Sequence, residues 1–217
     1  MALTLVFGNK NYSSWSLRPW IAMKVAGIPF EEKLIPLHQP DTAAEIAKFS
    51  PAGKVPILID GDMTVWESLA ILDHLADRFP DAKLWPSDPK AKAHARAVAA
   101  EMHAGFGPLR NHCPMNMRRP PKKRDLPQDV MANIKRIDAI WSESRARFGK
   151  SGPFLFGAFG AADAMYAPVV SRFVTYELPA SQASRDYIAA VTALPAWAEW
   201  RDAGLKETWR IADDEVD

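Results

Sequence analysis

The stretch GKVPILIDGDMTVWESLAILDHLADRF, residues 53–79, contains a hairpin followed at once by a helix. Residues 55–59 form a short apolar run, and Gly61-Asp62 is typical of a tight turn that leads into a second strand over residues 64–66. Beyond this strand the apolar residues recur every three or four positions, as on one face of a helix, until Pro80 stops it. The stretch therefore predicts two antiparallel strands and an amphipathic helix.

Two pairs of a strand and a helix precede the hairpin. In order, they are a strand over residues 3–7, a helix over 17–27, a strand over 31–37 and a helix over 42–49 that Thr42 caps. Proline has no N–H group, so it costs a helix no hydrogen bond only when it lies in the first turn. Pro19 should therefore lie in the first turn, which predicts an N-cap at Ser16 or later. Ser13 and Ser14 are then expected at the mouth of that helix.

The second half of the chain carries helical periodicity and no strand alternation. Helices are predicted over residues 91–102, 130–148, 161–175, 184–192 and 197–205. Prolines cluster between residues 80 and 89, and Ser87-Asp88-Pro89 is typical of a cap and a helix start. We therefore predict an α/β domain with a mixed sheet over residues 1–80, a linker over 81–88 and an all-helical domain over 89–217.

The composition is that of an ordinary globular chain of 217 residues, a length that suits one or two domains. Hydrophobic residues make up 48% and charged residues 24%, which excludes a disordered or low-complexity chain. Lys and Arg total 27 against 26 Asp and Glu, so a net charge of +1 provides no overall field for nucleic acid or an anionic membrane. Neither is expected as a partner.

Cys113 is the single cysteine, so the chain cannot form an internal disulfide or a cysteine-rich metal site. We interpret it as an inert thiol and expect no metal. The start MALTLVFGNK lacks the basic flank and cleavage pattern of a signal peptide, and no run reaches the roughly 20 apolar residues that span a bilayer. These features predict a soluble, cytoplasmic protein.

Three short motifs carry the candidate chemistry. Residues 13–18, SSWSLR, place hydroxyls near the start of a helix, where unpaired amides stabilise an anion, although a serine there is also an ordinary cap. Val55-Pro56 begins a strand, a place that suits a cis bond, although most such bonds are trans. Glu67-Ser68 opens a helix, either as a cap or as a grip on the ammonium and carboxylate of an amino acid.

Taken in order, these motifs resemble the cytosolic glutathione transferases of the serine type. SSWSLR resembles the S-S-x-S-x-R stretch of the zeta class, and Gly157 to Asp163 resembles the buried motif that begins the family's central helix, with Asp163 as its acid. Further residues resemble the thioredoxin-like domain of the phi and zeta classes: His38, Pro51, Gly53-Lys54-Val55-Pro56, Gly61-Asp62 and Glu67-Ser68. The resemblance covers nearly the whole chain.

This resemblance implies a thioredoxin-like first domain, a cis bond at Pro56, a homodimer and glutathione as co-substrate. It matches Ser13 to the catalytic serine, with Ser14, Ser16 and Tyr12 as alternates. The other implied contacts with glutathione are the Val55 backbone at the cysteinyl part, Glu67 and Ser68 at the γ-glutamyl end, and His38 and Lys54 at the glycyl carboxylate.

The implied activity is conjugation of glutathione to a small hydrophobic electrophile in a pocket lined by Tyr12 and Trp15. A zeta-type cis-trans isomerase, acting on a substrate like maleylacetoacetate, ranks below it because Trp15 stands where that class has cysteine. A non-catalytic protein that stores ligands on the same fold is the third possibility. The basic run 118–124 is interpreted as a solvated loop that could edge the electrophile pocket and favour anionic electrophiles.

Overall fold

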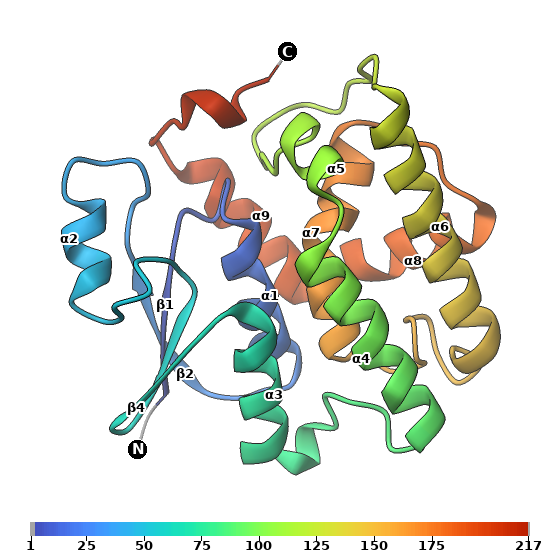
Figure 1. Ribbon diagram of the computed structural model, residues 1–217, viewed down its shortest axis with the longest axis horizontal. Helices are drawn as coiled ribbons and strands as arrows, with labels where there is room; N and C mark the ends of the chain where they lie inside the picture. The colour runs from blue at the N-terminus through green and yellow to red at the C-terminus, as the bar shows by residue number, and fades with distance from the viewer. Residues whose placement is uncertain (1–2, 217) are drawn as a thin grey trace.

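A computed structural model describes residues 3–216, in which a sheet-containing part is followed by a bundle of helices (Figure 1). The first part runs β1 (Leu3–Phe7), α1 (Ser14–Val25), β2 (Phe30–Leu34), α2 (Thr42–Ala47), β3 (Ile57–Asp60), β4 (Met63–Trp66) and α3 (Ser68–Arg78). Its strands lie in the order β2-β1-β3-β4, with β1 parallel to β2 and antiparallel to β3, and β3 antiparallel to β4. This is the predicted mixed sheet.

Helices cover both faces of the sheet because β1 is apolar on both. Leu5 and Phe7 point to the face that α1 and α3 cover and join the main core. Val6 points to the other face, where it packs with Ile46 of α2 and with Ile57. A strand that buries both faces needs a continuous apolar run, as residues 3–7 provide.

The second part is helical. It contains α4 (Pro89–Ala104), α5 (Gly107–His112), α6 (Gln128–Phe148), α7 (Ala161–Thr175), α8 (Gln182–Thr192) and α9 (Pro195–Lys206), with short 3-10 turns at Pro80–Ala82 and Ala212–Asp214. Helix α7 is buried along almost its whole length and packs against α1, α4 and α8, so it joins the two parts. Asp163 fixes its start by accepting hydrogen bonds from the amides of Leu155 (3.0 Å) and Gly160 (2.9 Å).

The start of α1 differs from the prediction: its N-cap is Ser13, and Pro19 lies inside the helix. Proline in a helix interior removes one backbone hydrogen bond and costs about 3 kcal/mol or more. Leu17, Trp20 and Ile21 on the same helix are fully buried, and their packing offsets that cost. Ser13 therefore lies at the positive end of α1 and not in a loop ahead of it.

Helix α5, which has six residues and begins with Gly107 and Pro108, is not predicted from the sequence. A Gly-Pro pair normally marks a break, yet proline is well tolerated in the first turn, and Leu109 is fully buried. Other boundaries shift by a few residues, and the helix start at Asp88-Pro89 agrees with the prediction.

Within residues 3–216 no helix is both long and apolar enough to cross a membrane. The same residues contain no cluster of three or more His, Cys, Asp or Glu side chains suited to a metal ion. The division at residues 80 and 89 remains a prediction.

Candidate functional site

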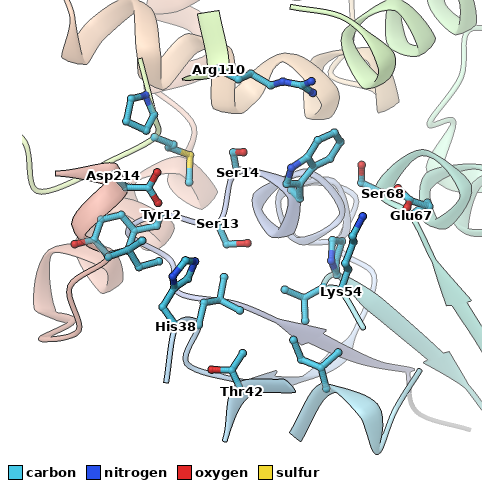
Figure 2. A pocket seen from close by; sticks show the side chains of 18 of the residues that line it. Tyr12, Ser13, Ser14, His38, Thr42, Lys54, Glu67, Ser68, Arg110 and Asp214 are labelled. Atoms are coloured by element: carbon cyan, nitrogen blue, oxygen red, sulfur yellow. The ribbon is translucent and has the colours of Figure 1, made fainter. Parts of the chain in front are cut away.

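A cavity of about 810 Å³ lies where the sheet-containing part meets the helices. The start of α1, the segment before β3 and the turn into α3 line one side (Figure 2). The ends of α4 and α5, together with the chain after α9, line the other. Of the residues predicted for the site, the cavity gathers Tyr12, Ser13, Ser14, Trp15, His38, Lys54, Val55, Pro56, Glu67 and Ser68; Ser16 does not line it.

The serines at the start of α1 have different surroundings. Ser13 donates a hydrogen bond from Oγ to Ser16 Oγ at 2.7 Å, and Ser16 Oγ accepts one from the amide of Gly8 at 3.1 Å. Ser16 is fully buried behind Ser13. Ser14 lines the cavity, and its hydroxyl has no hydrogen-bond partner among residues 3–216. Two hydroxyls thus face the cavity at a helix N-terminus, which stabilises negative charge there.

The segment before β3 forms the next part of the wall. The Val55–Pro56 peptide bond is cis, and both residues line the cavity. Lys54 and His38 are exposed and border the same space, and neither forms an ion pair within the described part of the chain. Two side chains that can carry positive charge therefore face the cavity and can bind a carboxylate.

The turn into α3 places an acid beside a hydroxyl. Glu67 is the N-cap of α3, with a φ of 68°, and Ser68 is its first residue. Ser68 Oγ accepts a hydrogen bond at 3.3 Å from Nη1 of Arg18, a fully buried side chain. Burial, with Arg172 and Arg110 nearby, lowers the pKa of Arg18 to about 9. The exposed Glu67 carboxylate can pair with the ammonium group of an amino acid. The Ser68 hydroxyl, with the Arg18 cation behind it, can pair with the carboxylate.

Trp15 and Tyr12 line the cavity in different ways. The Trp15 ring lies under the Arg18 guanidinium at 4.0 Å and packs edge-on against His103 at 5.4 Å. The Tyr12 hydroxyl donates a hydrogen bond to the Glu215 carboxylate and accepts one from the Arg118 guanidinium. Burial and the hydrogen bond to Glu215 raise the pKa of Tyr12 above its usual value. Tyr12 thus presents its ring to the cavity while its hydroxyl is already engaged.

Sequence reasoning missed four charged or titratable residues of the wall: His103, Arg110, Arg172 and Asp214. Each comes from the helical half or the chain after it, where no motif marks a lone side chain. Arg172 is fixed by the carbonyls of Cys113 (2.8 Å) and Pro168 (3.0 Å). Burial and the charge of Arg18, opposed by Glu67, lower the pKa of His103.

Contrary to expectation, the basic run 118–124 does not border this cavity. Lys123 and Arg124 border a separate hollow of about 290 Å³ beside Tyr176, and Lys122 lines neither space. Arg118 is engaged with Tyr12 and Glu215. Residues 120–127 form no helix or strand, and Pro120 and Pro121 disfavour a helix there.

Two family models match the chain. "Glutathione S-transferase, N-terminal domain" matches residues 12–78, and "Glutathione S-transferase, C-terminal domain" matches residues 118–203. A curated protein of Caenorhabditis elegans named "Probable maleylacetoacetate isomerase" is 35% identical over 99 residues, 46% of each chain. "Glutathione S-transferase 1" of Dianthus caryophyllus is 33% identical over 105 residues, 48% of each. The chain thus spans about half the length of the curated relatives it matches.

Solved structures resemble the whole fold. A glutathione transferase homolog from Burkholderia with bound glutathione has a TM-score of 0.71 at 20% identity, over 94% of this chain and 98% of the other. Human glutathione S-transferase T1-1 without ligand has a TM-score of 0.66 at 24% identity, over 94% and 90%. At these identities the likeness concerns the fold.

Proposed function

This chain belongs to the glutathione S-transferase family, and from that premise we propose that it binds glutathione, stabilises the thiolate with the Ser13 hydroxyl and conjugates it to a small hydrophobic electrophile. One observation carries the proposal. Side chains from four separate segments, with the chemistry that each part of glutathione requires, line a single cavity at the start of α1.

Glutathione has charge at both ends and a thiol between them, and the cavity wall offers a partner for each. Glu67 and Ser68 hold the ammonium and carboxylate of the γ-glutamyl end, while His38 and Lys54 pair with the glycyl carboxylate. The Val55 backbone contacts the cysteinyl part between them. The thiol then lies by Ser13, at the N-terminal end of α1.

Activation means stabilising the thiolate, because a free thiol with a pKa near 8.5 is mostly protonated at neutral pH. Lowering that pKa by about two units requires about 2.7 kcal/mol. A hydrogen bond to a charged group supplies about 1.5–3 kcal/mol, and a helix end about 0.3–1 kcal/mol. One hydroxyl at one helix end is sufficient.

The contact of Ser13 with Ser16 strengthens that hydrogen bond. When Ser13 turns its proton toward sulfur, its oxygen can accept the proton of Ser16, whose own oxygen accepts the Gly8 amide. The hydrogen bonds then run in one direction, from the Gly8 N–H to Ser16, from Ser16 to Ser13 and from Ser13 to sulfur, and each hydrogen bond polarises the next. Ser13 is the catalytic residue of the proposal, and Ser16 positions it.

The reaction then proceeds at the electrophile. The thiol releases its proton to solvent, and the sulfur lone pair forms a bond to an electrophilic carbon. In a substitution the leaving group departs with its bonding electrons, and in an addition the electron pair shifts onto the acceptor and takes up a proton. Tyr12 and Trp15 form part of the wall against which the electrophile lies.

The remaining parts of the proposal concern the assembly and its setting. We propose a cytoplasmic homodimer whose glutathione-binding domain covers residues 1–80 and whose helical domain covers residues 89–217, joined by a linker over 81–88. Sedimentation of the purified chain tests the dimer.

A second candidate is a glutathione-dependent isomerase. The curated relative from Caenorhabditis elegans carries that name, and the cavity presents Arg110 and Arg172, neither paired with a carboxylate among residues 3–216. Such cations would hold an acidic substrate. We rank isomerisation below conjugation because Trp15 stands where the zeta class has a cysteine.

The experiment is a turnover assay with glutathione and two substrates, an activated aryl halide and maleylacetoacetate. Conjugate formation that saturates with glutathione supports the first function, and isomerisation without conjugation supports the second. Glutathione binding by calorimetry with turnover of neither substrate contradicts both enzymatic proposals and leaves a ligand-binding protein.

A further inference from the structure

The loop before Ser13 is held from outside by an acid far along the chain. The amides of Lys10 and Asn11 donate to Glu207, at 2.6 Å to Oε1 and 3.0 Å to Oε2. Glu207 follows the last residue of α9, and the two contacts span almost the whole chain. A carboxylate that accepts two neighbouring backbone amides makes strong, charge-assisted hydrogen bonds.

The next two amides of the loop are bonded within the loop itself. The amides of Tyr12 and Ser13 both turn inward to the Asn9 carbonyl, at 3.2 and 2.8 Å. Those of Lys10 and Asn11 turn outward to α9. Glu207 therefore accepts the two remaining amide hydrogen bonds of the turn that leads into Ser13.

The end of α9 packs tightly against this loop at Gly204. A Cβ atom at Gly204 would lie 3.1 Å from the Asn11 amide nitrogen, closer than side chains normally come. On its other side the loop is tied to residues 116–118, since Asn11 Oδ1 accepts the Arg118 amide at 2.9 Å and the Asn11 carbonyl accepts that of Met117 at 3.2 Å. The loop is clamped between two segments of the helical half.

We propose that Glu207 is a positioning residue for the reaction: by holding the Lys10 and Asn11 amides it sets the place of the Ser13 hydroxyl relative to the thiol of glutathione. The inference rests on the proposed function. Glu207 does not line the cavity and touches no substrate. Its effect is on the ionisation of the thiol, whereas Lys54, Glu67 and Ser68 determine whether glutathione binds.

Two variants test this. Glu207→Gln keeps the shape but turns an NH2 group toward one of the two amides, so one hydrogen bond is lost. Gly204→Ala pushes the same loop by its new methyl group and leaves Glu207 intact. Glu199→Gln is the matched control on α9, because the one side-chain contact of Glu199 within residues 3–216 is an exposed ion pair with Lys24 at 2.7 Å.

The measurements are the pKa of the bound thiol, from thiolate absorbance, and the affinity for S-methylglutathione, which has no thiol to ionise. We expect both variants to raise the thiol pKa by about one unit, from near 6.5 to near 7.5, and so to lower kcat/KM about fivefold at pH 6.5. Affinity for S-methylglutathione should stay within twofold, and Glu199→Gln should match the wild type.

Variants that melt at lower temperature but keep the wild-type thiol pKa overturn the inference and leave Glu207 a purely structural contact. If Glu207→Gln does not fold, Gly204→Ala decides by the same criterion. A wild-type protein whose bound glutathione stays a thiol overturns the proposed function and this inference with it, so the two failures are distinct.

Discussion

Replacing Ser13 with alanine removes the hydroxyl that is proposed to stabilise the thiolate while leaving its surroundings in place. Ser16 keeps the Gly8 amide as a donor to its oxygen, and the Ser13 amide keeps its bond to the Asn9 carbonyl. The start of α1 therefore survives the change, and so does the effect of its N-terminal end on a nearby anion.

The expected magnitude follows from the lost hydrogen bond. A bond to a charged partner is worth about 1.5–3 kcal/mol, and one pKa unit corresponds to about 1.36 kcal/mol, so the pKa of the bound thiol should rise by about one to two units. With a wild-type value near 6.5, the thiolate fraction at pH 6.5 falls from about one half to about 3% when the pKa becomes about 8.

The assay is the pH dependence of conjugation at saturating glutathione, together with the absorbance of the bound thiolate. The rate deficit should be greatest below pH 7 and should shrink above pH 9, where the thiol ionises without help. Ser14→Ala is the matched control, since the Ser14 hydroxyl also borders the cavity. An unchanged thiol pKa in Ser13→Ala, with a raised pKa in Ser14→Ala, would refute the role of Ser13 and transfer it to Ser14.

Three further predictions concern the surroundings of Ser13. Ser16→Ala should raise the thiol pKa by less than Ser13→Ala does, because it weakens the Ser13 bond without removing it, and spectroscopic titration of both variants measures the difference. Lys54→Ala should raise the KM for glutathione about three- to tenfold and leave kcat unchanged, whereas Lys48→Ala, on an exposed lysine paired with Glu45, should do neither in steady-state assays. His103 has a lowered pKa in the folded chain, so below about pH 6.5 the unfolded chain takes up a proton that the folded chain resists. The free energy of unfolding should therefore fall as pH drops from 7.5 to 5.5, and less steeply in His103→Gln; equal slopes in urea denaturation would contradict this.

The sequence was informative where local chemistry decides the structure. Gly61-Asp62 between apolar runs predicted the β3–β4 hairpin, and Asp88-Pro89 predicted the start of α4, where the Asp88 side chain accepts the Ala91 amide at 2.8 Å. Both depend on neighbouring residues alone. The predicted site residues could likewise be chosen because each lies in a short motif.

The errors arose where distant packing overrides local preference. Pro19 argued against a helix start at Ser14, but the burial of Leu17, Trp20 and Ile21 keeps α1 intact around it. No local motif marks Arg172 or Glu207, and each binds a group that is distant in the sequence: the Cys113 carbonyl for Arg172 and the Lys10 amide for Glu207. Only the tertiary structure brings such pairs together.

The most direct measurement is a pH titration of the complex between the purified protein and glutathione, followed by thiolate absorbance, with S-methylglutathione as the blank. We predict that the bound thiol ionises about two pH units below the free value near 8.5. A bound thiol that ionises at or above the free value would contradict the claim that this cavity activates glutathione.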